Sequence, residues 1–528
     1  MMLETQNNSE NAPSYEFSSF RSSLAYSNAY FGLNIFDFYS PEQYSALVRD
    51  PMSNNQILRD ISLILYGTNG VYTNTVDYLK AMPTLDKVIV SHGKNVAKKK
   101  RNKELMQSTL RHIKEKEIIR DALFKGMIEG IAFYYFETVS RPQSNLKTMT
   151  DYDVQSIVEI NELGINASVI SLPTDYTQIV GIKNSSYVIA FNLDYFDLAS
   201  GESVEKKLRK FPKEIRDAYN NRRNKRSKDN GNWVVLDNNK TIVHKVRSKR
   251  DEKWGRPLVL AAINDILYGD YFTDTKRNVL DEINNRIIYE TFPEGKDKGS
   301  SALTQQQQKA QHEAVKSAVM NKNNRGGISF FSVSAGTKID AIEATNTDIF
   351  DDKYESNLND KISLDMGIAS SLLNGSSSGS YSSQENNLEL LTSQLFEWVE
   401  QIQSELNKCI SENIIKDNNN WVEVRYLPIT HVNKGKMVGY AKDLYLQGKG
   451  SLSLWAASCG ISPEVFFALL DEELEEDIEN KYVPHQTSYT LSNKDKQSGR
   501  PQTDTPSDST VNTRSNNGNA LPSPSDKN

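Results

Sequence analysis

Three stretches in the second half of the chain repeat apolar residues at the three- and four-residue spacing of a helix face. The first begins at Pro257 and continues to about residue 290, the second covers 350–372, and the third covers 388–409. The third carries the cleanest stripe, made of Leu388, Leu391, Leu395, Trp398, Ile402, Leu406 and Cys409. We therefore expect three long helices that each bury one face.

The second and third helical patterns are joined by NGSSSGSYSS, residues 374–383, which is almost entirely Ser and Gly. Connections between helices usually take two to eight residues, and longer ones tend to be functional or disordered. Capping-box spacing in Ser382-Ser383-Gln384-Glu385 predicts that the next helix starts just after it.

The period changes to two between residues 131 and 196, where short β-branched and aromatic runs alternate with turn residues. These runs are IAFYYFETV, SVISLP, TQIVGI and YVIAFN, and they predict a small antiparallel sheet. Residues 204–253 are expected to return to charged helix and turn. WVEVRYLPI (421–429) is a further predicted strand. The insert 292–347 predicts a polar helix (TQQQQKAQHEAVKSAVM) and two strands, GISFFSVS and TKIDAIEA.

Start and stop signals predict shorter helices elsewhere. Ser40-Pro41 opens the first, Ser53-Asn54-Asn55-Gln56 has capping-box spacing for the next, and Pro83 should break the pattern of 71–90. Residues 95–130 are basic and helical, and 432–480 read as short helices. Residues 1–35 and the tail from about 484 are too polar to bury a core, so we expect them to be disordered. The predicted fold class is α+β and mainly α-helical.

Composition limits the classes of protein that this chain can be. Its 528 residues, 38% of them hydrophobic, are ample for a large core. No apolar run reaches the 18 residues of a membrane span, and the N-terminus lacks the pattern of a signal peptide, so we expect no membrane partner. Two distant cysteines, Cys409 and Cys459, fit a reducing compartment. The net charge of −6 is unlike that of proteins whose role is to grip nucleic acid.

Familiar catalytic patterns are missing from the sequence. It has no G-x-x-x-x-G-K-[ST], H-E-x-x-H or G-x-S-x-G, and its six histidines are scattered. The acidic groups 348–352 and 472–476 sit among polar neighbours and are interpreted as solvated helix faces. We therefore predict no enzyme activity, no catalytic residue, no metal site and no cofactor.

The charge pattern around the Ser/Gly loop is uneven. From residue 362 to residue 407, 46 positions in a row, there is no Lys or Arg, although the chain has 62 of them. A loop that binds phosphate firmly would carry cations, because phosphate neutralisation supplies most non-specific DNA affinity. Two interpretations stay open: a surface loop with no role, or the lining of a passage along which a polyanion slides.

At this point the order of parts resembles the portal proteins of tailed bacteriophages, of the type found in phages of Gram-positive hosts. The passages that carry the resemblance are YGTNGVYTNTVDYLKAMPTLDKVIV, SLPTDYTQIVGIKNSSYVIAFNLDYFD and GIASSLLNGSSSGSYSSQENNLELLTSQLFEWVEQIQSELN. The resemblance covers roughly residues 50–483. It implies a homo-oligomeric ring, typically a dodecamer, at one vertex of the capsid in the virion, made in the host bacterial cytoplasm.

Such a ring would be the channel for double-stranded DNA during genome packaging and ejection, and a head–tail connector. The implied partners are the terminase large subunit, the major capsid and scaffold proteins, and a head-completion adaptor. The resemblance also implies the regions, which are a flexible arm (1–36), the wing (37–255), a stem helix (256–291), the clip (292–346), a second stem helix (347–373), the tunnel loop (374–385), a long wing helix and strand (386–426), the crown (427–483) and a disordered tail (484–528).

Two sets of residues are therefore candidates for contact with DNA. The tunnel loop would present Asn374, Ser376, Ser377, Ser378, Ser380, Tyr381, Ser382 and Ser383. A possible polyanion contact lies in the basic run Lys98, Lys99, Lys100 and Arg101. Two other functions stay open: a monomeric DNA-binding protein that uses the basic helix 94–117 with 222–227, and a metal-dependent nuclease built from dispersed carboxylates.

Overall fold

The computed structural model describes residues 41–138, 167–197, 204–224, 231–284, 287–297, 299–320, 332–342, 352–368 and 381–481. The chain divides into two compact units between Ser462 and Pro463. In the described part, no single helix is long and apolar enough to cross a membrane, although the broken pair Leu452–Ser458 and Pro463–Glu475 passes that test of length and composition together. The second unit contains α17 (Pro463–Glu475) and α18 (Ile478–Lys481).

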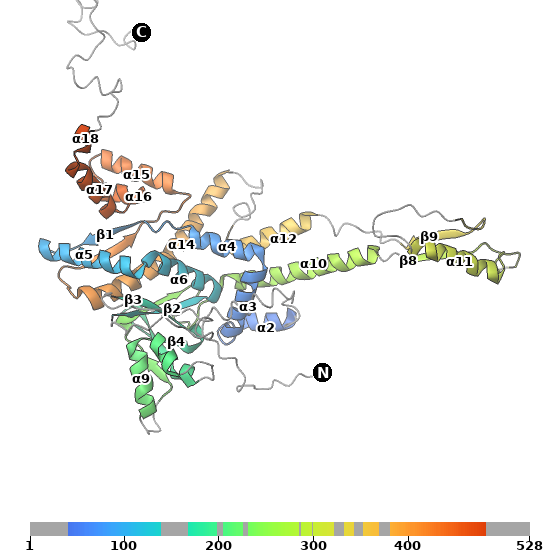
Figure 1. The fold of residues 1–528 in the computed structure, drawn as a ribbon, viewed down its shortest axis with the longest axis horizontal. Helices are drawn as coiled ribbons and strands as arrows, with labels where there is room; N and C mark the ends of the chain where they lie inside the picture. Colours follow the sequence, from blue (N-terminus) through green and yellow to red (C-terminus); the bar gives the residue numbers. More distant parts are fainter. Residues whose placement is uncertain are drawn as a thin grey trace, which may run out of the picture. The chain divides into compact units, whose positions relative to one another are not determined.

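In its described residues, the first unit is mainly helical with four small sheets (Figure 1). Its α-helices are α2 (Pro41–Arg49), α3 (Asn55–Thr68), α4 (Gly70–Ala81), α5 (Val96–Ile113), α6 (Glu115–Glu129), α8 (Val204–Lys210), α9 (Lys213–Asn224), α10 (Ile263–Asn284), α11 (Gln305–Met320), α12 (Asp352–Asp365), α14 (Tyr381–Ile410), α15 (Lys434–Leu446) and α16 (Leu452–Ser458). Its strands are β1 (Lys87–Ser91), β2 (Ile131–Glu137), β3 (Ser168–Leu172), β4 (Thr177–Lys183), β5 (Ser186–Asn192), β6 (Trp233–Val235), β7 (Thr241–Lys245), β8 (Ile287–Thr291), β9 (Lys338–Ile342) and β10 (Val422–Tyr426). The predicted class, α+β and mainly helical, is confirmed.

Strand β2 separates two hydrophobic cores. Successive side chains of a strand point to opposite faces, and every residue of β2 is buried. Phe133 and Tyr135 enter the core formed with α8, α9 and β5, whereas Tyr134 and Phe136 enter the larger core of α3–α6 and α14. The antiparallel sheet order β3-β2-β7 places this doubly buried strand in the centre.

The predicted single sheet is in fact two three-stranded sheets, β3-β2-β7 and β4-β5-β6. Two of their strands, β6 and β7, fall in the stretch 204–253 that was expected to be only helix and turn. Strand β7 is short and fully buried, and its Lys and His hide the apolar run that marks a buried strand. The turn predicted between β4 and β5 is confirmed, with Asn184 and Ser185 at positive φ, as a tight hairpin requires.

The helix boundaries show two further differences. The helix expected to reach residue 290 ends at Asn284, because the β-branched run from Ile287 pairs with β9 instead. The capping box expected from Ser53 is not formed: Asn54 is the residue before α3, and its side-chain amide donates to the Asp50 carbonyl at 3.0 Å. The break predicted at Pro83 is confirmed, because α4 ends at Ala81.

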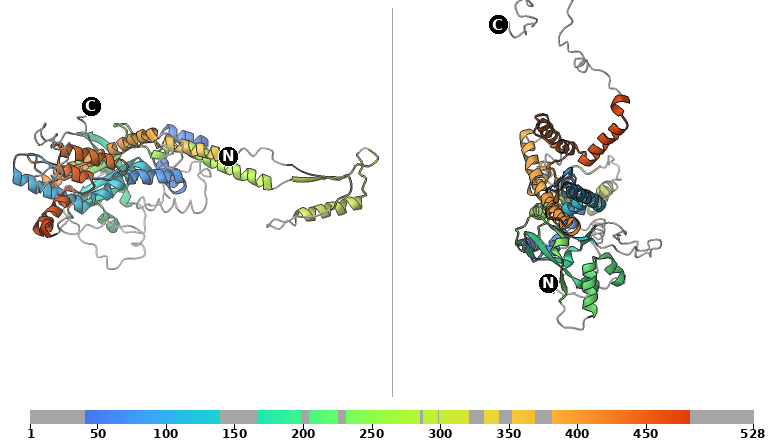
Figure 2. Two further views of the ribbon diagram at one scale, coloured as in Figure 1. Left: turned by 90° about the horizontal axis from the view of Figure 1, so that it is seen from above. Right: turned by 90° about the vertical axis from the view of Figure 1, so that its left-hand side faces the viewer.

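Helices α10 and α12 lie side by side and run in opposite directions (Figures 1 and 2). Lys361 of α12 donates to Asp265 of α10 at 2.6 Å. Further along, Gly269 lies against Leu358, whose side chain would be 2.9 Å from an added Cβ. The ammonium of Lys276 then reaches Glu355 of α12 at 3.3 Å.

The insert between these helices forms a small module of its own. Strands β8 and β9 pair antiparallel, with Ile287 opposite Ile342, so the chain enters and leaves the module at neighbouring positions. Helix α11 is tied to this hairpin by buried Gln311, which donates to Glu290 at 2.6 Å and to Thr337 at 2.9 Å. The predicted polar helix and the strand in TKIDAIEA are confirmed, and most of GISFFSVS lies outside the described residues.

Candidate functional site

The C-terminal end of α12 is closed by a Schellman motif. Ile368 N–H donates to the Ser363 carbonyl at 3.0 Å, and Gly367 N–H donates to the Leu364 carbonyl at 2.9 Å. Gly367 has φ +90°, a conformation that glycine adopts without strain. Ile368 is 3% exposed and packs in the same core as Ile362, which is the apolar contact expected of this motif.

Arg247 connects this end of α12 to the start of the α10 segment. One guanidinium nitrogen donates to the Met366 carbonyl at 2.8 Å and the other to the Leu258 carbonyl at 3.0 Å. Burial lowers the pKa of Arg247, but an arginine stays protonated in proteins. One cation therefore binds a carbonyl just after α12 and a carbonyl in the 3-10 turn Leu258–Ala261 that precedes α10, and it fixes both to the chain that follows strand β7.

Next to this end of α12, the carboxyl groups of Asp265 and Asp365 lie close to the ammonium of Lys361. Burial opposes the charged form of Asp265, but hydrogen bonds from Asp365 and Lys361 outweigh burial and lower its pKa. The hydrogen bond to Asp265, and then burial, raise the pKa of Asp365. The two carboxyl groups therefore shift each other's pKa in opposite directions across the α10–α12 seam, with Lys361 as the counter-charge.

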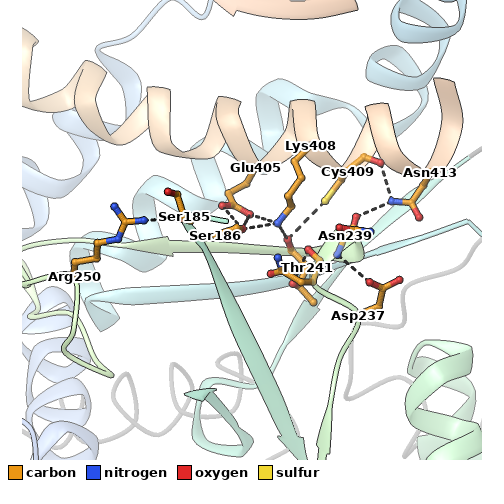
Figure 3. A network of polar contacts seen from close by, with 11 residues as sticks. Ser185, Ser186, Asp237, Asn239, Thr241, Arg250, Glu405, Lys408, Cys409 and Asn413 are labelled. Carbon is orange, nitrogen blue, oxygen red and sulfur yellow. Dashed lines mark hydrogen bonds and ion pairs between the residues drawn. The ribbon is translucent and has the colours of Figure 1, made fainter. Parts of the chain in front are cut away.

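The long helix α14 is attached to the sheets by a network of charged and polar side chains (Figure 3). Lys408 donates to Glu405 at 2.5 Å, to the Ser186 hydroxyl at 2.7 Å and to the Thr241 carbonyl at 3.0 Å. The Ser186 hydroxyl in turn donates to Glu405. Beside it, Cys409 is buried against Thr241, and burial raises the pKa of its thiol to about 12. The thiol is therefore an inert packing group.

Amide side chains of α14 extend this attachment to two strands. Asn407 both donates to and accepts from the backbone of Val424 in β10, each at 2.9 Å. The side-chain Oε1 of Gln403 accepts from Tyr426 N–H at 2.7 Å, and the side-chain Oε1 of Gln401 lies 2.9 Å from Nδ1 of His244 in β7, within hydrogen-bond distance. Helix α14 is consequently fixed along its length from Leu391, where its burial begins.

Only three of the predicted tunnel-loop residues lie among the residues that the structure describes. Asn374, Ser376, Ser377, Ser378 and Ser380 lie outside the described residues. Tyr381, Ser382 and Ser383 belong to the first turn of α14, because that helix begins at Tyr381 and not near 386 as expected. The loop assigned to 374–385 is therefore shorter at its C-terminal end, and its role stays a prediction.

Several apolar side chains of α10, α12 and α14 are exposed to solvent in the single chain. Tyr268 and Tyr271 of α10 are 59% and 63% exposed, Leu364 of α12 is 69% exposed, and Leu390 of α14 is 71% exposed. Large apolar side chains that a single chain leaves exposed are typical of a surface that another protein covers.

The second predicted set, Lys98, Lys99, Lys100 and Arg101, lies in the first half of α5. Lys99 is half-buried and the other three are exposed. Among the described residues none of the four has an ion-pair partner. The described residues also contain no group of three or more His, Cys, Asp or Glu placed to hold a metal ion, so the site of a nuclease was not found there.

Sequence reasoning missed Arg247 and the network around Lys408. Arg247 stands in a charged stretch, RSKRDEK, that looks like an exposed turn. Glu405 and Lys408 have the i, i+3 spacing of an ordinary surface pair. The only available signal was the position of both charges on the apolar stripe of a long helix, next to Leu406 and Cys409.

Comparison with known proteins gives no match to a family model and no match among curated proteins. Among solved structures, the neck of an empty GTA particle computed with C6 symmetry is 12% identical, with TM-score 0.43 over 80% of this chain and 95% of that chain. The neck of a native GTA particle computed with C12 symmetry is 11% identical, with the same TM-score and coverage. An HK97 family phage portal protein from Corynebacterium diphtheriae is 10% identical, with TM-score 0.27 over 68% of this chain and 93% of that chain. Values this low do not establish a common fold over the whole chain.

Proposed function

We propose that this chain is a portal protein of a tailed bacteriophage, which assembles into a ring and conducts double-stranded DNA. The observation that carries the proposal is the arrangement of α10 and α12. They form an antiparallel pair, joined at one end by a module that can act as a clip, followed by an uncharged loop and the firmly attached helix α14. This order of parts is the one on which the sequence resemblance rests.

The exposed apolar side chains of the pair support assembly. Tyr268 and Tyr271 are one helical turn apart, so they form a continuous apolar strip on α10. In a ring each copy would cover this strip with a different surface of its neighbour, since head-to-tail contacts close when the rotation is right. The ring would consist of twelve copies, in keeping with the resemblance.

The charge pattern supports a conduit. The chain before the segment 369–380 is held by Arg247 and the Schellman motif, and the chain after it is attached from Leu391 onward in α14. The segment itself has hydroxyl and amide groups but no cation. Twelve copies would multiply any attraction for phosphate, so a passage that lets DNA move needs weak contacts.

The remaining parts of the proposal follow from the same resemblance. The β8–β9–α11 module would dock the terminase large subunit and later a head-completion adaptor. The ring would sit at one capsid vertex of the virion, next to the major capsid and scaffold proteins. ATP hydrolysis would belong to the motor.

The first experiment is the native mass of the purified protein by light scattering, followed by electron-microscope class averages. We expect particles near twelve times 59.7 kDa with a central hole. Tyr268→Ser/Tyr271→Ser should weaken the ring, whereas the matched control Tyr78→Ser/Tyr440→Ser, at residues 50% and 61% exposed on α4 and α15, should not. A monomer that stays monomeric with scaffold and capsid proteins present would contradict the proposal.

A second experiment tests the conduit. Ser376→Lys/Ser377→Lys/Ser378→Lys should slow or stop packaging, because cations would bind the passing phosphates. The control replaces the same three residues with Ala, which removes hydroxyls without adding charge. Normal packaging by the lysine variant would refute a sliding contact at this loop.

A further inference from the structure

The first half of α5 combines a dense group of cations with a fixed backbone. Five of the six residues from Lys98 to Lys103 are Lys or Arg, and the only acidic residue close by on this helix is Glu104. Lys98, Lys100 and Arg101 are exposed. In the described part of the chain no carboxylate pairs with them, although ion pairs engage many other surface cations.

The opposite side of this helix is clamped to the loop before β10. Buried Asn102 donates to the Asn420 carbonyl at 2.7 Å, and the Asn420 side chain accepts from Asn95 N–H at 3.2 Å. Asp417 holds the loop by accepting from Asn420, and these hydrogen bonds lower the pKa of Asp417. The Asp417 carboxylate therefore accepts hydrogen bonds from amide donors and does not form an ion pair with Lys98, Lys100 or Arg101.

The start of α5 is ordered by the same clamp. The Asn95 side chain caps the helix by accepting from Lys98 N–H at 3.0 Å. His92 stacks on Trp421 with ring centroids 3.8 Å apart, which fixes the segment leading into the helix. The exposed cations thus stand on a rigid support, so less conformational entropy is lost when they bind.

We propose that this surface, defined by Lys98, Lys100 and Arg101, binds the phosphate backbone of double-stranded DNA. This contact would be a second one, separate from the contact between DNA and the conduit. Lys98 and Arg101 are one helical turn apart on the same side of α5, about 4.5 Å along the helix axis, and each strand of B-DNA carries one phosphate per about 3.4 Å of axis, so this pair matches two phosphates. The same chain would then carry a surface that holds DNA and a loop that does not. The choice of DNA as the polyanion rests on the proposed function.

The contacts are to phosphate, so binding is independent of sequence and steeply dependent on salt. No described aromatic or amide side chain of α5 stands among the three cations to read a base edge. The surface is therefore suited to transient holding of DNA of any sequence, as a packaged genome would require.

The test measures binding of a short fluorescent DNA duplex by anisotropy, between about 50 and 200 mM salt, on full-length protein of known native mass. We expect Lys98→Gln/Arg101→Gln to weaken binding and to reduce the slope of log K against log salt by about 1.8 for each bound surface, at about 0.9 per phosphate contact. The matched control is Lys442→Gln/Lys449→Gln, which removes two exposed lysines elsewhere and should leave the slope unchanged.

A second variant, Lys98→Glu/Arg101→Glu, should abolish the salt-dependent binding while circular dichroism shows an intact fold, because the Asn102 clamp is untouched. If both α5 variants bind like the parent protein, or if the control loses as much, the inference is wrong. The measured mass separates this result from the proposed function. A ring whose α5 variants bind normally overturns only this inference, whereas a monomer whose slope falls as expected overturns only the ring.

Discussion

Lys408 offers the sharpest test of how the long helix is held. Its three N–H groups are all used, by Glu405, Ser186 and Thr241. The side chains of Lys408 and Glu405 are only 20% and 11% exposed. Lys408→Met should remove the counter-charge and leave the Glu405 carboxylate with a single hydroxyl donor, Ser186.

The magnitude follows from what remains buried. Breaking a buried ion pair by removing one partner costs about 3–5 kcal/mol, and the partial exposure of this pair places it at the low end, about 3 kcal/mol. Replacing both charges by apolar groups often costs little. We therefore expect Glu405→Leu/Lys408→Met to be within about 1 kcal/mol of the parent protein, and so more stable than the single variant.

The free energy of unfolding would be measured by urea titration with tryptophan fluorescence, for which buried Trp398 of α14 is a local probe. Protein concentration is held constant, because assembly adds to apparent stability. Lys442→Met on the exposed surface of α15 is the control and should change stability by less than about 0.5 kcal/mol. If the double variant is as unstable as Lys408→Met alone, the loss does not come from a stranded carboxylate.

Three further predictions concern the same region. Arg247→Leu should leave the Leu258 and Met366 carbonyls without this donor and lower the free energy of unfolding by about 2 kcal/mol. Limited proteolysis next to α12 should then be faster than in the parent protein, and Arg247→Lys should be cleaved at an intermediate rate. Burial lowers the pKa of His244 to about 4, so as pH falls below about 6.5 the unfolded chain binds a proton before the folded chain does. The free energy of unfolding should therefore fall by about 3 kcal/mol by pH 4, and His244→Gln should lack this fall. Gly126→Ala places a Cβ 2.7 Å from the His244 ring and should lower stability in thermal melting by about 1–3 kcal/mol. The control Gly67→Ala, in open space on α3, should be neutral or stabilising, and equal effects of the two variants would refute the packing argument.

Elements with a strong period could be predicted from the sequence, because one local pattern decides them. The stripe from Leu391 to Cys409 buries in α14 as expected, and Pro83 ends α4 as expected. The exact end of α10 could not be predicted. Ile283 and Ile287 continue the helical spacing, and only the pairing of Ile287 with Ile342, 55 positions away, decides that the second of them is in a strand.

The candidate site was predictable only in its composition. The absence of cations from 362 to 407 and the cations at 98–101 can be read directly from the printed chain. The distant partners of Arg247 and Lys408 cannot, since the Met366 carbonyl lies at the end of α12 and the Ser186 hydroxyl and Thr241 carbonyl lie in strands far away in the sequence. A charged residue in a polar stretch is therefore interpreted as solvent-exposed until the fold shows which buried groups it binds.

The pairing of Ile287 with Ile342 has a consequence for how such proteins can change. Because the chain enters and leaves the β8–β9–α11 module at adjacent points, the module can be lengthened, shortened or exchanged while α10 and α12 keep their contacts. A lineage could thus acquire a new docking specificity by recombination at two neighbouring sites. The same geometry makes this the natural place to graft a foreign domain onto the protein.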